Sequence, residues 1–188
     1  VCGHAAVTNT CGLKRLAAIP NFSEIERDVD FETGTLKENA VQFFYSVLEA
    51  PSQEEIEEYI LFGCQKLNEA GITAIQSDDL ASLPGKNWRR IMDAFRNLDE
   101  KGRLTVRIYE QCLFERLEEG KAFIEEGFRT GQTGHKFTIG PMKMLQDGSL
   151  GAMTAALEEP YEGGAGNRGL TIYSQAALDD MLDFCDRH

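Results

Sequence analysis

GPMKMLQDGSLGAMTAAL, residues 140–157, places a single lysine, Lys143, inside an apolar run with the composition of a β-strand. A polar, glycine-rich turn that contains Asp147, Ser149 and Thr154 follows directly. Burying an unpaired ammonium group is costly, so Lys143 needs a partner, a neutral state or a chemical modification. Catalytic residues of α/β proteins lie at the carboxyl ends of strands, which is where this turn falls. We therefore expect part of an active site here.

The clearest helix lies well before this segment. Ser52 and Glu55 have the spacing of a capping box, and apolar residues recur at helical spacing over residues 56–67. Gly71 has the position of the residue that follows a helix end, and the strand-like run 72–76 comes next. The pattern predicts a helix that leads into a strand through a single glycine.

The same unit recurs along the chain. The patterns predict helices over 88–98 and 110–128, strands over 104–109 and 142–145, and a last helix that starts after Ser174. Alternating helices and strands are typical of a parallel α/β fold. A complete parallel barrel needs eight strands and typically ~250 residues, so these strands are too few to close one.

The first fifty residues have a different character. They predict a short helix over 13–19 that stops before Pro20, a hairpin over 31–36 with Gly34 at its tip, and a helix over 38–48. We divide the chain into an irregular, helical segment at 1–50 and successive helix–strand units at 51–188.

Charge and composition exclude several classes of partner. The 188 residues carry 19 basic and 31 acidic side chains, which gives a net charge of −12. Such a surface repels nucleic acid and anionic lipid. No apolar run approaches the ~18 residues that a membrane span needs. We expect neither nucleic acid nor a membrane as a partner.

The five cysteines are odd in number, scattered and without a CxxC pair. This arrangement predicts reduced thiols and a cytoplasmic protein rather than a disulfide framework. Cys2, His4 and Cys11 are close in sequence but lack the second ligand pair of a zinc site. The chain has no initiator methionine or signal peptide, and we expect it to be truncated at both ends.

Three segments together carry a family resemblance. They are GHAAVTNT at 3–10, AGITAIQSD at 70–78, and KMLQDGSLGAMTA at 143–155, which is followed by Glu159-Pro160-Tyr161. The chain resembles the amidohydrolase superfamily, specifically the amidohydrolase family 3 or YtcJ-like group, and the third segment is much the most specific. The resemblance covers nearly the whole chain, as the central portion of a longer family member.

The resemblance implies a fold and an activity. Members of this family have a (β/α)8 barrel, the TIM-barrel fold, joined to a small β-sandwich, with one or two divalent metals at the top of the barrel. We therefore expect a partial barrel and a metal-dependent hydrolase that cleaves C–N, amide-like bonds of a small molecule. Zinc is the expected metal, and a metal-bound water would be the nucleophile. The alternative is a non-catalytic binding or regulatory module on a degenerate barrel.

Only one metal ligand of the family carries over to this chain, the lysine that can be carboxylated to bridge two metals. It corresponds to Lys143. The family's HxH pair is absent, because the only histidines are His4, His135 and His188. We expect the isolated chain to be inactive and free of metal, since one ligand cannot hold a catalytic ion. Exposed edges of an incomplete barrel predict self-association.

The remaining candidates each have two interpretations. Asp147 is a candidate catalytic residue and Ser149 a substrate contact, or both belong to a helix-capping turn. His4 reaches substrate or lies on the surface. Lys143 is a metal ligand, or it is a lysine at the edge of the interior that snorkels to solvent or pairs with Asp147. Asp78 and its neighbour at 79 close a strand at the catalytic face or are solvated turn residues.

Overall fold

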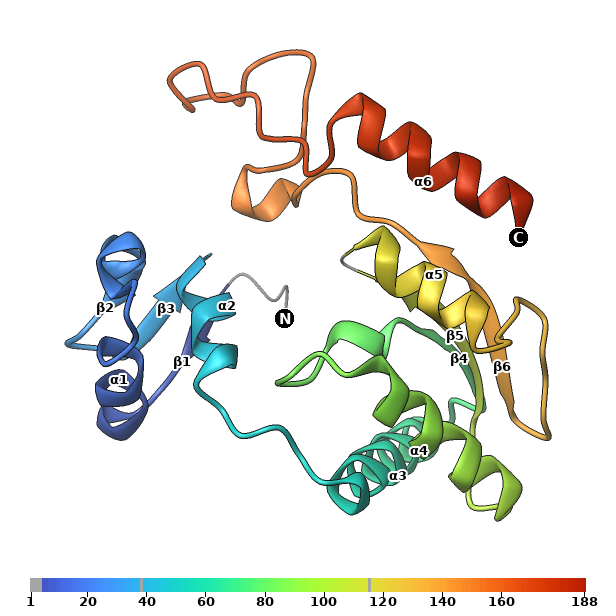
Figure 1. Cartoon of the computed structure of the whole chain (residues 1–188). Helices are drawn as coiled ribbons and strands as arrows, with labels where there is room; N and C mark the ends of the chain where they lie inside the picture. Colours follow the sequence, from blue (N-terminus) through green and yellow to red (C-terminus); the bar gives the residue numbers. More distant parts are fainter. Residues whose placement is uncertain (1–4, 38, 115) are drawn as a thin grey trace. The chain divides into compact units, whose positions relative to one another are not determined.

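The computed structural model describes residues 5–37, 39–114 and 116–188 (Figure 1). The chain divides into two compact units. One comprises the residues up to 52 together with 83–87, and the other comprises residues 53–82 and 88–188. Among the described residues no helix has the length and apolar character needed to cross a bilayer.

The smaller unit is built on an antiparallel sheet with the strand order β1-β3-β2. Its elements are β1 (Ala5–Val7), α1 (Thr10–Ala17), the 3-10 helices η1 (Phe22–Glu24) and η2 (Glu26–Asp28), β2 (Val29–Asp30), β3 (Thr35–Lys37) and α2 (Asn39–Ser46). The predicted hairpin is confirmed, with Gly34 at a φ of 74° between β2 and β3. Leu16 and Leu36 are fully buried and belong to its apolar core.

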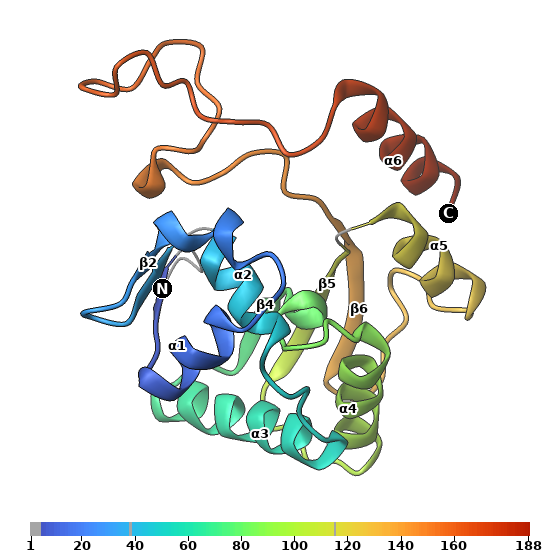
Figure 2. The same ribbon diagram turned by 60° about the vertical axis from the view of Figure 1, so that its left-hand side comes forward.

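The larger unit contains the predicted alternation of helices and strands. Its elements are α3 (Gln53–Glu69), β4 (Ala74–Ser77), the 3-10 helix η3 (Asp79–Ala81), α4 (Trp88–Glu100), β5 (Arg107–Leu113), α5 (Leu117–Glu125), β6 (Phe137–Lys143), the 3-10 helix η4 (Leu150–Ala152) and α6 (Gln175–Arg187). The three strands form a parallel sheet in the order β4-β5-β6. Figure 2 shows the same elements from a second direction.

Each of the first three helices of this unit ends in the same way. Gly71, Gly102 and Gly127 follow α3, α4 and α5 with positive φ angles of 75°, 66° and 91°. At the first joint the amide of Ile72 donates to the carbonyl of Leu67 at 2.9 Å, and equivalent bonds close the other two helix ends. A residue with a Cβ is strained at such a φ, so glycine provides the turn from helix to strand.

The buried face of α4 joins the helices to the sheet. Its apolar residues recur at helical spacing and all are buried: Trp88, Ile91, Met92, Phe95 and Leu98. The ring of Phe95 stacks on that of Phe137 in β6, with 4.9 Å between the ring centres. Burying a side chain of this size stabilises the folded state by roughly 1.5–3 kcal/mol. The predicted core face of this helix is confirmed.

Two predicted boundaries are wrong around β5. The strand extends to Leu113, beyond the predicted 104–109, and the helix predicted from residue 110 begins at Leu117. The reason is that Ile108, Glu110 and Cys112 continue the alternation of buried positions along β5.

The strand that carries Lys143 also differs from its prediction. It runs over Phe137–Lys143 rather than 142–145, so Lys143 is its last residue. The polar stretch before it folds back on the strand, where the amide of Gly131 donates to the carbonyl of Ile139 at 2.8 Å. The amide of Ile139 donates in turn to the carbonyl of Gln132 at 2.9 Å, so this part of the sheet edge is paired.

The class and the parallel sheet agree with the predicted partial barrel. Three parallel strands form an open sheet, and the described residues close no barrel. A closed eight-stranded barrel needs five more strands, so these three strands cannot close one.

Candidate functional site

The carboxyl ends of β4 and β6 bring together two charged side chains. The ammonium nitrogen Nζ of Lys143 forms an ion pair with Oδ2 of Asp78, which directly follows β4. The register of the sheet explains the meeting, because Ser77 pairs with Glu110, and Leu113 further along β5 pairs with Lys143. Both charged side chains are partly exposed, at 31% for Lys143 and 42% for Asp78.

Lys143 does not pair with Asp147, which was one of the interpretations of Lys143 left open by the sequence. Instead, Oδ2 of Asp147 accepts the backbone amide of Ala156 at 2.9 Å. Lys143 ends β6 and pairs with the residue that follows β4, on the far side of β5. Asp147 lies in the loop that leads away from the sheet and forms a bridge with Thr171.

A further carboxyl group, that of Glu110, lies close to this pair. Glu110 on β5 is completely buried, and its Oε1 accepts the backbone amide of Asp79 at 2.7 Å. Its second oxygen, Oε2, has no hydrogen-bond partner among the described residues. The hydroxyl of Ser77 donates to Oδ2 of Asp79. Glu110 thus supports the turn that carries Asp78.

Burial determines the electrostatics of this cluster. Loss of solvent, together with the nearby charge of Asp79, raises the pKa of Glu110 to about 8. Burial also raises the pKa of Asp79, against the lowering effect of the Ser77 hydroxyl. A carboxyl in an apolar position favours its neutral form because that form loses less solvation energy. At neutral pH Glu110 is therefore protonated in large part.

The glycine-rich turn after β6 is held together by its own hydrogen bonds. The amide of Ser149 donates to the hydroxyl of Thr154 at 3.0 Å, and the amide of Thr154 donates to the carbonyl of Ser149 at 3.0 Å. Asp147 is exposed and Ser149 is half-buried. This turn presents both side chains near the end of β6 without a hydrogen bond or ion pair to Lys143 among the described residues.

The histidine candidates lie apart from the cluster or outside the structure. His4 and Cys2 are outside the described residues. The backbone amide of His135 donates to Asp99 at 2.8 Å, in the turn before β6, at the opposite end of that strand from Lys143. His188 follows α6, where its ring lies 4.8 Å from that of Phe184.

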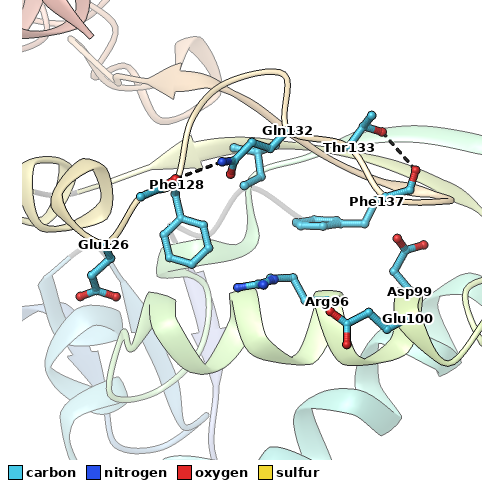
Figure 3. A pocket seen from close by; sticks show the side chains of 11 residues that line it. Arg96, Asp99, Glu100, Glu126, Phe128, Gln132, Thr133 and Phe137 are labelled. Carbon is cyan, nitrogen blue, oxygen red and sulfur yellow. Dashed lines mark hydrogen bonds between the residues drawn. The ribbon is translucent and has the colours of Figure 1, made fainter.

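A hollow of about 400 Å³ lies between α4 and residues 126–139. Figure 3 shows Arg96, Asp99 and Glu100 on α4, opposite Phe128 and Phe137. Buried Asp99 accepts the backbone amides of His135 and Lys136 at 2.8 and 2.7 Å. The arrangement fixes the entry into β6, and it lies at the end of the strand remote from Lys143.

The side chains around Lys143 do not provide enough ligands for a divalent metal among the described residues. Within the described ranges no group of three or more His, Cys, Asp or Glu side chains could hold an ion. Lys143 is engaged in an ion pair with Asp78. The described residues do not make up a metal site, so no chemical step is assigned to a metal here.

Sequence and structure comparisons agree on the relationships of this chain. The sequence model of the Amidohydrolase family matches residues 1–188. A curated relative, "Putative amidohydrolase YtcJ" of Bacillus subtilis (strain 168), is 23% identical over 193 residues, which cover 97% of this chain and 34% of the relative.

Two solved structures share the fold. They are uncharacterized metal-dependent hydrolases from Pyrococcus horikoshii OT3 and Pyrococcus furiosus, with TM-scores of 0.75 and 0.73 and identities of 22% and 21%. Each comparison covers 98% of this chain, and 35% and 36% of the two solved chains respectively. The chain belongs to the amidohydrolase family, and it spans about a third of the length of the relatives it matches.

Proposed function

We propose that this chain forms part of a metal-dependent hydrolase that cleaves C–N, amide-like bonds of a small molecule. The observation that carries the proposal is the position of Lys143, at the carboxyl end of β6 and beside the end of β4. Family membership and a fold shared with two metal-dependent hydrolases support it. In α/β folds this edge of the sheet is where catalytic groups gather.

Lys143 is the residue that we assign to metal binding, as a carboxylated lysine in the complete protein. Zinc is the ion that we propose, and it requires ligands beyond the residues described here. Asp147 is our candidate catalytic carboxylate, and Ser149 and His4 are candidate substrate contacts. Asp78 holds the Lys143 amine when no metal is bound.

Metal analysis of the complete protein tests this function. We expect about one or two zinc-like ions per chain and a loss of amide hydrolysis after treatment with a chelator. Lys143→Ala should remove metal and activity, whereas Lys121→Ala, at an exposed position on α5, should leave both unchanged. Full metal content in the Lys143→Ala protein would refute the assignment of Lys143.

The alternative function is a non-catalytic binding or regulatory module. The observation in its favour is the pairing of Lys143 with Asp78, which satisfies the lysine without any metal. Under this alternative the complete protein binds no stoichiometric metal, and chelators leave its binding to a partner unchanged. The metal analysis therefore separates the two functions.

We also propose that the chain self-associates through β4. Within the described residues β4 pairs only with β5, so its other edge is open, whereas residues 131–134 pair with part of the outer edge of β6. Open strand edges are templates for pairing with another chain. Light scattering on the 188-residue chain should show species larger than a monomer, and a stable monomer would contradict the proposal.

A further inference from the structure

Glu110 occupies a buried position in β5. Side chains of a strand alternate between the two faces of a sheet. Glu110 shares its face with the buried side chains of Ile108 and Cys112, and Leu113, the neighbour of Lys143, belongs to the other set. Glu110 and Lys143 thus lie on different faces of the same sheet.

Glu110 nevertheless contacts the turn that carries Asp78, through a hydrogen bond to the backbone of Asp79. Its Oε1 accepts the amide of Asp79 at 2.7 Å, and Asp79 is the residue next to Asp78. Leu80, the following residue, is buried at 1% exposure and packs the same turn into the core. The backbone of Asp78, with φ −143° and ψ 50°, belongs to neither a regular helix nor a strand. An outside contact is therefore needed to define its direction.

The cost of this arrangement argues for a specific role. A buried polar group without a complete set of hydrogen bonds destabilises a protein. Oε2 of Glu110 lacks a partner among the described residues, and the positions on either side of it on this face carry Ile108 and Cys112. An apolar side chain would fill position 110 at lower cost, but it would leave the amide of Asp79 without this acceptor.

We propose that Glu110 is a positioning residue for the Asp78–Lys143 pair, acting from beneath the sheet through the amide of Asp79. The relevance of this role to hydrolysis rests on the proposed function, whereas the role itself rests on the contacts of these four residues. Glu110 makes no contact with substrate and takes no part in the chemistry. It sets the direction from which Asp78 meets the lysine amine.

The reactivity of the Lys143 amine provides the test. The 188-residue chain is treated with limiting acetylating reagent, and peptide mass spectrometry gives the acetylation of Lys143 relative to that of exposed Lys121. An amine in an ion pair reacts more slowly than a free one. Asp78→Asn should raise the ratio about 1.5-fold to fivefold, the range expected for a partly exposed ion pair.

Variants at position 110 separate positioning from general destabilisation. Glu110→Ala should raise the ratio toward that of Asp78→Asn, and the double variant should exceed Asp78→Asn by no more than the error. Glu110→Gln retains an acceptor oxygen and should stay near the wild-type ratio. Leu104→Ala removes a buried side chain before β5 and should lower the thermal midpoint without changing the ratio.

Three results would overturn the proposal. They are an unchanged ratio in Glu110→Ala, a ratio in Glu110→Gln as high as in Glu110→Ala, and equal increases in Glu110→Ala and Leu104→Ala. If Glu110→Ala does not fold, Glu110→Met takes its place, because it keeps most of the side-chain volume but removes the acceptor, and it should raise the ratio whereas Glu110→Gln should not. Metal analysis of the complete protein reports separately on the proposed function, because acetylation requires no metal.

Discussion

Lys143 and Asp78 are 65 positions apart in the sequence, and they form an ion pair at the carboxyl edge of a three-stranded parallel sheet. One residue ends β6 and the other follows β4, with β5 between the two strands. The ion pair gives Lys143 the charged partner that a lysine in an apolar strand requires. It also shows that β4, β5 and β6 build the candidate site together.

The first prediction concerns the pH dependence of folding. Glu110 has a folded-state pKa of about 8 against an ordinary value of 4.5. Between these values the folded chain keeps a proton that the unfolded chain releases, so stability falls as pH rises through this window. The slope reaches at most about 1.4 kcal/mol per pH unit, and outside the window the contribution is constant.

Glu110→Gln removes this titration and serves as the comparison. Urea unfolding of both proteins at pH 5, 6.5 and 8 should show wild type losing stability relative to Glu110→Gln as pH rises. Other titrating groups cancel in the difference between the two proteins. Parallel stability curves would show that Glu110 is ionised in the folded chain at all three pH values.

Asp99 is expected to be important for stability rather than for chemistry. It is 5% exposed and accepts two backbone amides of the turn before β6. Asp99→Ala leaves those amides without their acceptor, so we expect a loss of about 2–3 kcal/mol in the free energy of unfolding. Glu100→Ala, at the exposed neighbouring position, should change it by less than about 0.5 kcal/mol. Equal effects in denaturant titrations would contradict this role.

The cysteines should differ in reactivity with a thiol reagent. Cys11 is exposed, whereas Cys64 and Cys112 are buried. Burial raises the pKa of the Cys112 thiol to about 12, which suppresses the reactive thiolate. In the native chain Cys11 should react with the reagent while Cys112 stays unmodified. In denaturant both thiols should react. Peptide mass spectrometry identifies the modified residues, and early modification of Cys112 would disprove the prediction.

The turn after β6 should tolerate a methyl group at one glycine and not at another. A Cβ on Gly148 would lie 2.1 Å from the hydroxyl oxygen of Thr154, whereas a Cβ on Gly151 would meet nothing within 4 Å. Gly148→Ala should open the turn and break the bond between Ser149 and Thr154. Limited proteolysis should then cut the turn at least several-fold faster than in Gly151→Ala. Equal cleavage rates would rule out this packing.

The sequence predicted the elements better than their ends. The apolar periodicity of α4 and the glycine after α3 identified a helix and a helix end, and both are present. The acidic Glu110 was assigned to a helix, although its alternation with Ile108 and Cys112 placed it in β5. That alternation was the one available signal for a buried carboxyl group.

Local sequence determined the class of this protein. Capping residues, glycine joints and apolar periods act between residues a few positions apart, so the sequence alone predicted alternating helices and strands and the segment around Lys143. The tertiary structure decided which groups meet. Asp78 reaches Lys143 and Glu110 reaches the amide of Asp79 across 65 and 31 positions, because parallel strand register aligns their ends. Strand register depends on the packing of the whole sheet, which no short stretch of sequence encodes.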